Sequence, residues 1–180
     1  ALFVARPDVP WRTLAAYGTL IGAGQFGLMF IAMRADITPG LASLVIQTQV
    51  FFTIGLAMVF SSERLKRVQA AALALAACGL AVIAWHTDAA TTPLGLALVL
   101  AAAVCWAGGN TVAQRAGKVP ILGFMVWSSL FAVPPLLVLS LWLEGPIAIA
   151  QGLSQAGWGT WVAVLWQSIG NTLFGYGAWA

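Results

Sequence analysis

The chain has 180 residues, of which 61% are hydrophobic and only 7% are charged, and its mean hydropathy is +0.94. A soluble domain carries about 25% charged residues because water must cover its surface, so this composition excludes an ordinary soluble globular domain. The formal net charge of +3 comes with no basic stripe, which argues against binding to nucleic acid. Most of the surface must therefore face lipid, and the bilayer is the first partner that the sequence predicts.

Long intervals without charged residues predict the membrane spans. A helix needs about 20 apolar residues to cross the hydrocarbon core of a bilayer, and it satisfies its own backbone hydrogen bonds, unlike an open strand in lipid. The apolar runs are continuous and do not alternate with polar residues, which argues against a β-barrel. The predicted fold class is all-α, a polytopic transmembrane helical bundle. We place its six spans at 13–33, 40–61, 67–86, 93–113, 120–143 and 157–180.

Local signals mark the beginning of two helices and the packing of others. Thr38-Pro39 and Thr92-Pro93 each offer a capping hydroxyl followed by a proline at the first helical position. Gly18 and Gly22 are four residues apart, a spacing that lets helix backbones approach closely. The pair Pro134-Pro135 lies inside 120–143, where it removes backbone donors and must bend the span.

Basic residues predict the orientation. Seven of the eight Lys and Arg residues fall in alternate connections, and Arg34 lies on the opposite face together with Asp36, Asp88 and Glu144. Loops on the cytoplasmic side carry an excess of Lys and Arg, so we predict a multi-pass protein of the bacterial inner membrane. The loops that we place in the cytoplasm contain Arg6 and Arg12, Arg64, Lys66 and Arg67, and Arg115 and Lys118.

The two ends predict an internal piece of a longer protein. The chain has no initiator Met and no signal peptide. Its first residues, Ala-Leu-Phe-Val-Ala-Arg-Pro, are typical of the end of a preceding span, and the chain stops inside the last predicted helix.

A short pattern occurs twice. Ile-Gly-x-x-x-Phe-Gly at 21–27 recurs at 169–175, an offset of 148 residues. Predicted helices begin about 29 residues apart, so the offset corresponds to five helices, an odd number that reverses the direction of the chain. Inverted repeats of this kind are typical of secondary transporters, whose substrate site lies between the halves near the midplane. The alternative is a chance match in Gly-rich apolar helices.

If the repeat is real, the visible spans are helices three to eight of ten. Residues 1–88 then hold the last three helices of the first repeat, and residues 89–180 hold the first three of the second.

Three stretches carry a resemblance to a known family. The run from Thr38 to Thr53, Thr-Pro-Gly-Leu-Ala-Ser-Leu-Val-Ile-Gln-Thr-Gln-Val-Phe-Phe-Thr, is closed by Ser-Glu-Arg-Leu at 62–65. It resembles the fourth helix of the drug/metabolite transporter superfamily, and more narrowly that of EamA-type transporters. Cys-Trp-Ala-Gly-Gly-Asn at 105–110 and Phe-Gly-Tyr-Gly-Ala-Trp at 174–179 are similar to its sixth and eighth helices.

The resemblance implies a function and an architecture. The element Gln-x-Gln-x-Phe-Phe-Thr is similar to the branch that exports O-acetylserine and cysteine. The resemblance implies an exporter of ten helices, arranged as two inverted five-helix repeats with both termini in the cytoplasm. Departures from the family pattern are Ser61-Ser62 before the Glu, where a Gly is usual, and the more polar residues Gln167, Asn171 and Thr172.

Neutral polar residues near the midplane are the candidate substrate-binding residues. By helical rise, Gln25, Gln47, Gln49 and Gln167 lie at similar depths, with Asn171 one turn beyond Gln167. If Ser128 joins them, four helices present hydrogen-bonding groups around one central space. Amides hydrogen-bond both the ammonium and the carboxylate of an amino acid. Alternatively, the same side chains only join helices to each other. Gln47 and Gln49 are about 200° apart on a helix, so at most one points into a cavity.

The remaining residues separate the classes of function. No charged residue or His lies deep in a predicted span, and Cys78 and Cys105 stand alone as small packing residues, so no metal or cofactor is expected. An intramembrane enzyme needs a nucleophile beside a base, and the single His, His86, lies at a helix end. We predict a non-enzymatic exporter of a small amino-acid-like metabolite. Export of another small amphiphile or drug, and a non-transporting membrane scaffold, are the alternatives. The sequence indicates no oligomeric state.

Overall fold

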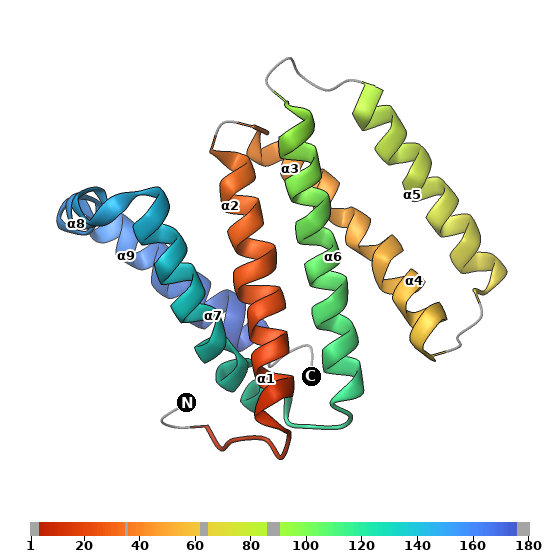
Figure 1. Ribbon diagram of the computed structural model, residues 1–180, viewed down its shortest axis with the longest axis horizontal. Coiled ribbons are helices and arrows are strands. Elements are labelled where there is room, and N and C mark those ends of the chain that lie inside the picture. Colours follow the sequence, from red (N-terminus) through yellow and green to blue (C-terminus); the bar gives the residue numbers. More distant parts are fainter. Residues whose placement is uncertain (1–3, 35, 62–64, 86–90, 176–180) are drawn as a thin grey trace.

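The computed structural model is helical throughout its regular elements and describes residues 4–34, 36–61, 65–85 and 91–175, the side chains of 61, 83–85 and 171–173 excepted (Figure 1). The helices in chain order are α1 (Trp11–Tyr17), η1 (Gly18–Phe26), α2 (Gly27–Met33), α3 (Pro39–Val45), η2 (Ile46–Thr48), α4 (Gln49–Ser61), α5 (Arg67–Trp85), α6 (Pro93–Arg115), α7 (Ile121–Leu143), α8 (Gly145–Gln155), α9 (Trp158–Leu165) and η3 (Trp166–Phe174). The elements η1 and η3 are wound as π-helix, and η2 is wound as 3₁₀-helix.

Helices form where the charge-free intervals predicted them. Four are long and apolar enough to cross a membrane, namely Trp11–Met33, Pro39–Phe60, Pro93–Arg115 and Ile121–Leu143. We call the first of these the first span, which joins α1, η1 and α2 without a break, and the next the second span, which joins α3, η2 and α4. A shorter apolar helix is described at Arg67–Val82. The last predicted span is represented by α9 and η3, which are continuous; the prediction for 176–180 lies outside the described residues.

Two local features differ from the expectation. Residues 4–10 are irregular and not the end of a helix; the Trp127 indole donates a hydrogen bond of 3.0 Å to the Val4 carbonyl and holds this segment against α7. The connection after α7 forms α8, which the sequence analysis treated as loop. Gly145 has a φ of +80°, which only a residue without Cβ adopts easily, and Pro146 follows at the helix start. The chain therefore turns sharply and starts a new helix, too short to span a bilayer.

The two predicted helix caps are confirmed. The hydroxyl of Thr38 accepts a hydrogen bond from the Leu41 amide at 3.4 Å, and that of Thr92 accepts one from the Gly95 amide at 3.0 Å. Each threonine has an extended backbone and is followed by a proline at the first helical position. Thr92 also donates to the Asp36 carboxylate at 2.8 Å, so this cap joins α6 to the connection between the first two spans.

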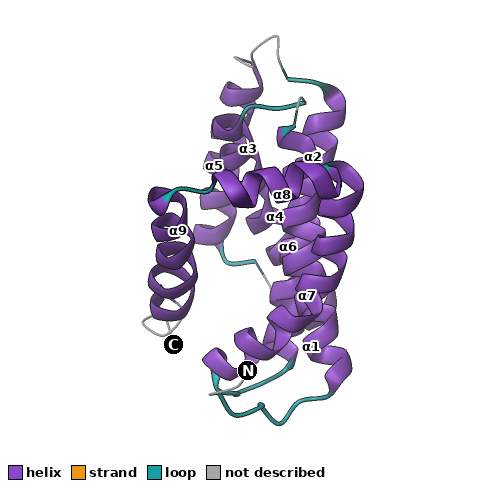
Figure 2. Cartoon of the chain, turned by 90° about the vertical axis from the view of Figure 1, so that its left-hand side faces the viewer, coloured by secondary structure: helices purple, strands orange, loops and turns teal. Residues whose placement is uncertain are grey.

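Four elements form a row in the centre of the molecule. The first span lies between α6 and α7, and α6 in turn packs on the second span. Figure 1 shows this row, with α7 to the left, the first span and α6 in the middle and α4 to the right. Helices α5 and α9 stand outside it, and in the turned view α9 lies to one side of the bundle (Figure 2). The closest packing of the molecule is therefore around the first span and α6.

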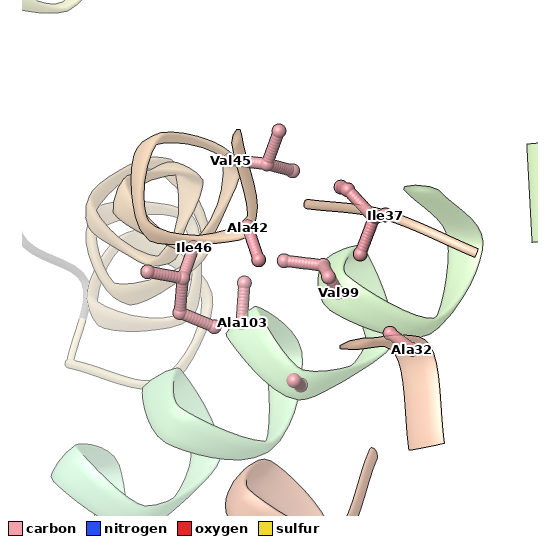
Figure 3. Close-up of a cluster of buried hydrophobic side chains, with 8 residues drawn as sticks. Ala32, Ile37, Ala42, Val45, Ile46, Val99 and Ala103 are labelled. Carbon is pink, nitrogen blue, oxygen red and sulfur yellow. The ribbon is translucent and has the colours of Figure 1, made fainter. Parts of the chain in front are cut away.

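The core of this row consists largely of small residues. One buried cluster joins the C-terminal end of the first span, the second span and α6, and it includes Ala32, Ala42, Val99, Ala102 and Ala103 (Figure 3). Small side chains let helix backbones approach, which is how helices associate in a solvent as apolar as their own side chains. Many large apolar residues point outward instead, among them Phe60, Leu75, Val138, Trp142 and Trp166. In water such a surface would drive aggregation; in a bilayer it is the solvated face.

Candidate functional site

Glycines bring the first span into close contact with α7. A Cβ atom on Gly18 would meet the backbone of Ser128, and one on Gly22 would meet the Cβ of Ala132. Neither position can carry a side chain unless a backbone moves. The predicted close approach at this pair is thus confirmed, and its partner is α7. Because both contacts advance by four residues on each helix, the first span and α7 run in the same direction.

On its other side, the first span meets α6 in the same manner. A Cβ on Gly109 would lie 2.5 Å from the side chain of Ile21, and one on Gly24 would lie 2.9 Å from the sulfur of Cys105. Here the residue number falls on α6 as it rises on the first span, so these two helices are antiparallel. Cys105 therefore packs in a helix interface, as the sequence analysis expected. The relative directions of these three helices match an alternating topology across a membrane.

The segment of the first span that makes these contacts is η1. A π-helix closes i→i+5 hydrogen bonds and is wider than an α-helix; most examples are single turns, often at functional sites. Here nine residues, Gly18–Phe26, are wound in this way. Gly18, Gly22 and Gly24 leave room for the wider backbone against both neighbours. The most unusual backbone of the first span therefore coincides with its most closely packed stretch.

Two candidate residues are buried, one on the first span and one on α7. Gln25 at the end of η1 is 3% exposed. The side chain of Ser128 on α7 is 1% exposed, and its hydroxyl has no hydrogen-bond partner among the described residues. Leaving a buried polar group unpaired costs about 1–3 kcal/mol. Neighbouring Ser129 does not bear this cost because its hydroxyl donates to the Val126 carbonyl at 2.8 Å.

The candidate amides of the second span lie elsewhere. Gln47 is exposed and belongs to η2, whereas Gln49 is half-buried and begins α4. Their different exposure agrees with the expectation that the two side chains point in different directions. The second span packs mainly on α6, on the side away from α7. The structure thus brings Gln25 and Ser128 into one packed region but leaves the Gln47–Gln49 pair beyond α6.

The last two candidates are on η3. Gln167 is exposed, and the side chain of Asn171 lies outside the described part of the chain. In the described residues, the main contacts of η3 are with α9, its own continuation. No described element therefore brings these residues to the region around Gln25.

A feature that the sequence analysis did not identify is the break in the second span. Ile46–Thr48 is wound as 3₁₀-helix between α3 and α4, and it ends just before Gln49. The hydroxyl of Thr48 is buried and has no described partner. A stretch of 3₁₀-helix within a longer helix often marks a hinge or a strained site. The sequence carried no signal for it, because neither Gly nor Pro occurs in these three residues.

Two cavities border the first span. One, of about 440 Å³, is an open and mostly apolar groove lined by Thr19, Leu20, Ala23, Gly24, Gly27, Leu28 and Ile31 of the first span and by Pro135 and Leu139 of α7. The other, of about 260 Å³, lies between the start of the first span and the end of α6 and is lined by Arg12, Thr13, Ala16, Val112 and Arg115. None of the six candidate residues lines either cavity. Helix α7 is continuous through both Pro134 and Pro135. Pro135 is the one that lines the first groove.

These observations define a class: a multi-pass α-helical membrane protein with a glycine-lined helix interface and buried polar side chains. Two curated proteins are similar to the chain, and each is described as a probable amino-acid metabolite efflux pump. That of Salmonella typhimurium is 40% identical over 183 aligned positions, and that of Escherichia coli K12 is 36% identical over 183 positions.

Both alignments cover 98% of this chain and 61% of the relative, so the chain spans about three fifths of the length of each protein. Identity of this extent over nearly the whole chain shows that the three proteins are homologous. No family model and no solved structure matches the chain.

Proposed function

We propose that the chain is part of a secondary transporter that exports small amino-acid-like metabolites across the bacterial inner membrane. The observation that carries this proposal is the 40% identity, over 98% of the chain, to a protein described as a probable amino-acid metabolite efflux pump. The helices long and apolar enough to span a bilayer, the first span, the second span, α6 and α7, are what such a protein requires. Neither relative is described as an enzyme.

The family assignment that we propose is the EamA-type branch of the drug/metabolite transporters. It is supported by the motifs at 38–53, 62–65, 105–110 and 174–179 and by the relatives' description. Within this family the motif at 47–53 favours cysteine and O-acetylserine as substrates. A different small amphiphile or a drug is the second candidate, and it is favoured by the apolar lining of the groove beside Pro135.

For the substrate site we propose the six candidate polar residues as hydrogen-bonding partners. Gln25 and Ser128 contribute from the packed side of the first span, and Gln49 or Gln47 contributes beside the break in the second span. Gln167 and Asn171 join them from η3 in the assembled protein. A transported zwitterion has both donors and acceptors, so it can hydrogen-bond to amide and hydroxyl groups alike. We also propose that the loops bearing Arg6, Arg12, Arg64, Lys66, Arg67, Arg115 and Lys118 face the cytoplasm.

The direct test measures export from cells that express the full-length gene. Cysteine, O-acetylserine and a panel of other amino acids are quantified in the medium and compared with cells carrying an empty vector. We expect at least one amino acid to accumulate outside the cells faster than in the control. A drug-resistance panel in the same cells tests the second candidate. If no amino acid accumulates although the protein is inserted, the amino-acid assignment is wrong.

The contribution of the second span is tested with a matched pair of variants. We expect Gln49→Leu to reduce export several-fold and Gln47→Leu to reduce it less, because Gln49 is half-buried and Gln47 is exposed. Both proteins should insert to the wild-type level, because leucine is a good helix former and is favoured in a membrane span. Wild-type export from both variants would remove the second span from the proposed site.

A further inference from the structure

The cavity of about 260 Å³ lies where the first span begins and α6 ends. Arg12 and Thr13 belong to the first turn of the first span, and Arg115 is the last residue of α6. Because the two helices are antiparallel, these residues meet at the same end of the bundle (Figure 1). Trp11, beside Arg12, is 47% exposed, and tryptophans at the ends of spans prefer the boundary between lipid and water. This places the cavity at the depth of lipid headgroups.

The lining of this cavity carries positive charge that no lining residue balances. Two of the five lining residues are arginines, and none is acidic. The third polar member is Thr13, whose hydroxyl can donate a further hydrogen bond. Like charges that line one cavity repel each other, and an anion bound between them relieves this repulsion. The chemistry of the lining therefore fits an anion with several oxygen atoms.

The guanidinium of Arg115 is held in place by a contact that uses none of its hydrogen-bond donors. It lies over the ring of Phe60 near the end of α4, with its central carbon 4.6 Å from the ring centroid. A cation–π contact uses the charge of the guanidinium, and its five N–H groups stay available to an acceptor. Arg6 is different, because it donates to the Val9 carbonyl at 2.9 Å and so serves the fold itself. Arg115 is thus oriented beside the cavity with donors to offer.

We propose that this cavity binds a phosphate group, supplied by an anionic phospholipid of the adjoining leaflet. A guanidinium binds two phosphate oxygens at once through parallel N–H···O bonds, and the Thr13 hydroxyl can donate to another. Basic pockets between membrane helices suit anionic headgroups for this reason. The small apolar residues Ala16 and Val112 complete the lining, and they offer a surface to the carbons that follow the phosphate. On the topology proposed above, the leaflet is the cytoplasmic one.

The place of the cavity favours a lipid over a dissolved phosphate ion. It is open and borders the ends of two spans, where the acyl chains of a neighbouring lipid already hold a headgroup at the right depth. Such a headgroup loses less translational freedom on binding than a dissolved ion does. The two arginines also select among headgroups, because the ammonium of a zwitterionic lipid would come to lie beside their positive charges.

Native mass spectrometry of the full-length protein, purified in detergent and stripped of lipid, tests this proposal. Dioleoylphosphatidylglycerol is titrated in, and the apparent dissociation constant of the first bound lipid is measured. We expect Arg12→Gln and Arg115→Gln each to raise this constant about tenfold, because each removes a charged donor of hydrogen bonds to the phosphate. Lys118→Gln is the matched control. It removes the same charge from the connection after α6, but Lys118 is exposed and does not line the cavity, so the constant should change less than about twofold.

A further variant weakens the site without changing any charge. Ala16→Leu places a larger side chain in the lining of the cavity, and we expect it to weaken binding of the same lipid several-fold. Unchanged binding by this variant, or equal weakening by Arg12→Gln and Lys118→Gln, would show that only total charge matters and would overturn the proposal. Binding of dioleoylphosphatidylcholine as tight as that of dioleoylphosphatidylglycerol would overturn it as well.

Inorganic phosphate separates the two sources of the phosphate group. At the concentrations used for the lipid, it should leave the thermal midpoint of the stripped protein unchanged, whereas dioleoylphosphatidylglycerol should raise it. If inorganic phosphate raises the midpoint as much as the lipid does, the site takes a free anion and the lipid assignment is wrong. None of these measurements involves transport, so their failure is distinguishable from failure of the proposed function.

Discussion

The first span and the α9–η3 helix share a sequence pattern and a rare backbone conformation, yet one is packed on two sides and the other stands largely alone. In the first span, Gly18 and Gly22 accept α7, and Ile21 fits over Gly109 of α6. In η3, Ile169 is 56% exposed, and the three atoms nearest to a Cβ placed on Gly170 all belong to Trp166 of η3 itself. The difference teaches that the π-helical winding does not depend on the neighbours. It is a property of the local sequence, and the neighbours fit onto it.

This comparison also separates two meanings of an exposed residue in this protein. Phe60 and Val138 are exposed large apolar residues outside the sequence pattern that occurs twice, and lipid is a sufficient cover for them. Trp166 and Ile169 are exposed at positions whose counterparts, Gly18 and Ile21, contact other helices. The exposure of an apolar residue therefore says little by itself. It becomes informative when the position that matches it in the repeated pattern is packed against another helix.

The largest effect is expected for Gly22→Leu, which breaks the packed member of the pair. The new side chain would occupy the position of the Ala132 Cβ, and neither helix can retreat without losing its contact at Gly18. We expect a loss of about 3 kcal/mol or more in the free energy of unfolding, at the upper end of the range for overpacked cores. Thermal unfolding of the full-length protein in detergent, with export as the second readout, measures it.

Gly159→Leu is the control for this substitution. Gly159 lies near the start of α9, and nothing is found within 4 Å of a Cβ placed there. Its replacement should leave the unfolding midpoint within about 2 °C of the wild type, since surface changes away from contacts cost little. Equal stability of the Gly22→Leu and Gly159→Leu proteins would show that the first span is not packed as described.

Much of the fold follows from the sequence because the bilayer leaves so few alternatives. The beginnings of α3 and α6 were predicted from Thr38-Pro39 and Thr92-Pro93, and the close approach at Gly18 and Gly22 from their spacing alone. The identity of the partner helix was not predictable, because a pair of glycines indicates a close contact without specifying what makes it. The helix α8 was missed because only helices long enough to span a bilayer were placed, at 120–143 and 157–180; between them Gly145 provides the turn and Pro146 the helix start.

The candidate site was less predictable than the fold. Helical rise gives the expected depth of a residue along its helix, and Gln25 and Ser128 are both buried. Depth does not specify the side of the helix, so Gln47 and Gln49 fell beyond α6 and Gln167 on an open segment. The 3₁₀ break contains the hydroxyl of Thr48, which has no described partner, and no residue type in the break predicts it from sequence.

A smaller effect is expected for Gly109→Ala, which sharpens the comparison on the α6 side. Its Cβ would lie 2.5 Å from Cγ1 and Cδ1 of Ile21, the end of a flexible side chain that can partly move away. We expect a loss of about 1–2 kcal/mol, measured by thermal unfolding. Gly108→Ala is the matched control, because its Cβ would lie 3.5 Å from Leu20 in ordinary contact, and alanine favours helix.

The source of the Gly109→Ala effect is tested by a second substitution. Ile21→Ala removes the colliding atoms and should make the added Gly109→Ala nearly neutral, whereas Ile169→Ala, the equivalent change in η3, should leave the Gly109→Ala defect as it is. A coupling energy near zero between positions 21 and 109 would contradict the contact. Coupling between positions 169 and 109 would show that η3 reaches α6, and that the two halves are not arranged as the repeat requires.

The smallest effect on stability, and the most informative one for function, is expected for Ser128→Ala. Its hydroxyl is buried against η1 without a described partner, so removing it relieves an unpaired polar group, and the free energy of unfolding should stay within about 1 kcal/mol of the wild type or rise. If the hydroxyl binds substrate, the same change should lower export several-fold, because a lost hydrogen bond costs about 1 kcal/mol. Ser129→Ala is the control, because the hydroxyl of Ser129 is bonded to the Val126 carbonyl within α7; this change should alter neither export nor stability appreciably.

If the Ser128 hydroxyl only joined α7 to the first span, Ser128→Ala would give the reverse result, with lower stability and normal export per inserted molecule. The pattern of the two readouts therefore distinguishes a substrate contact from a helix contact at the one interface where the first span differs most from its counterpart in η3.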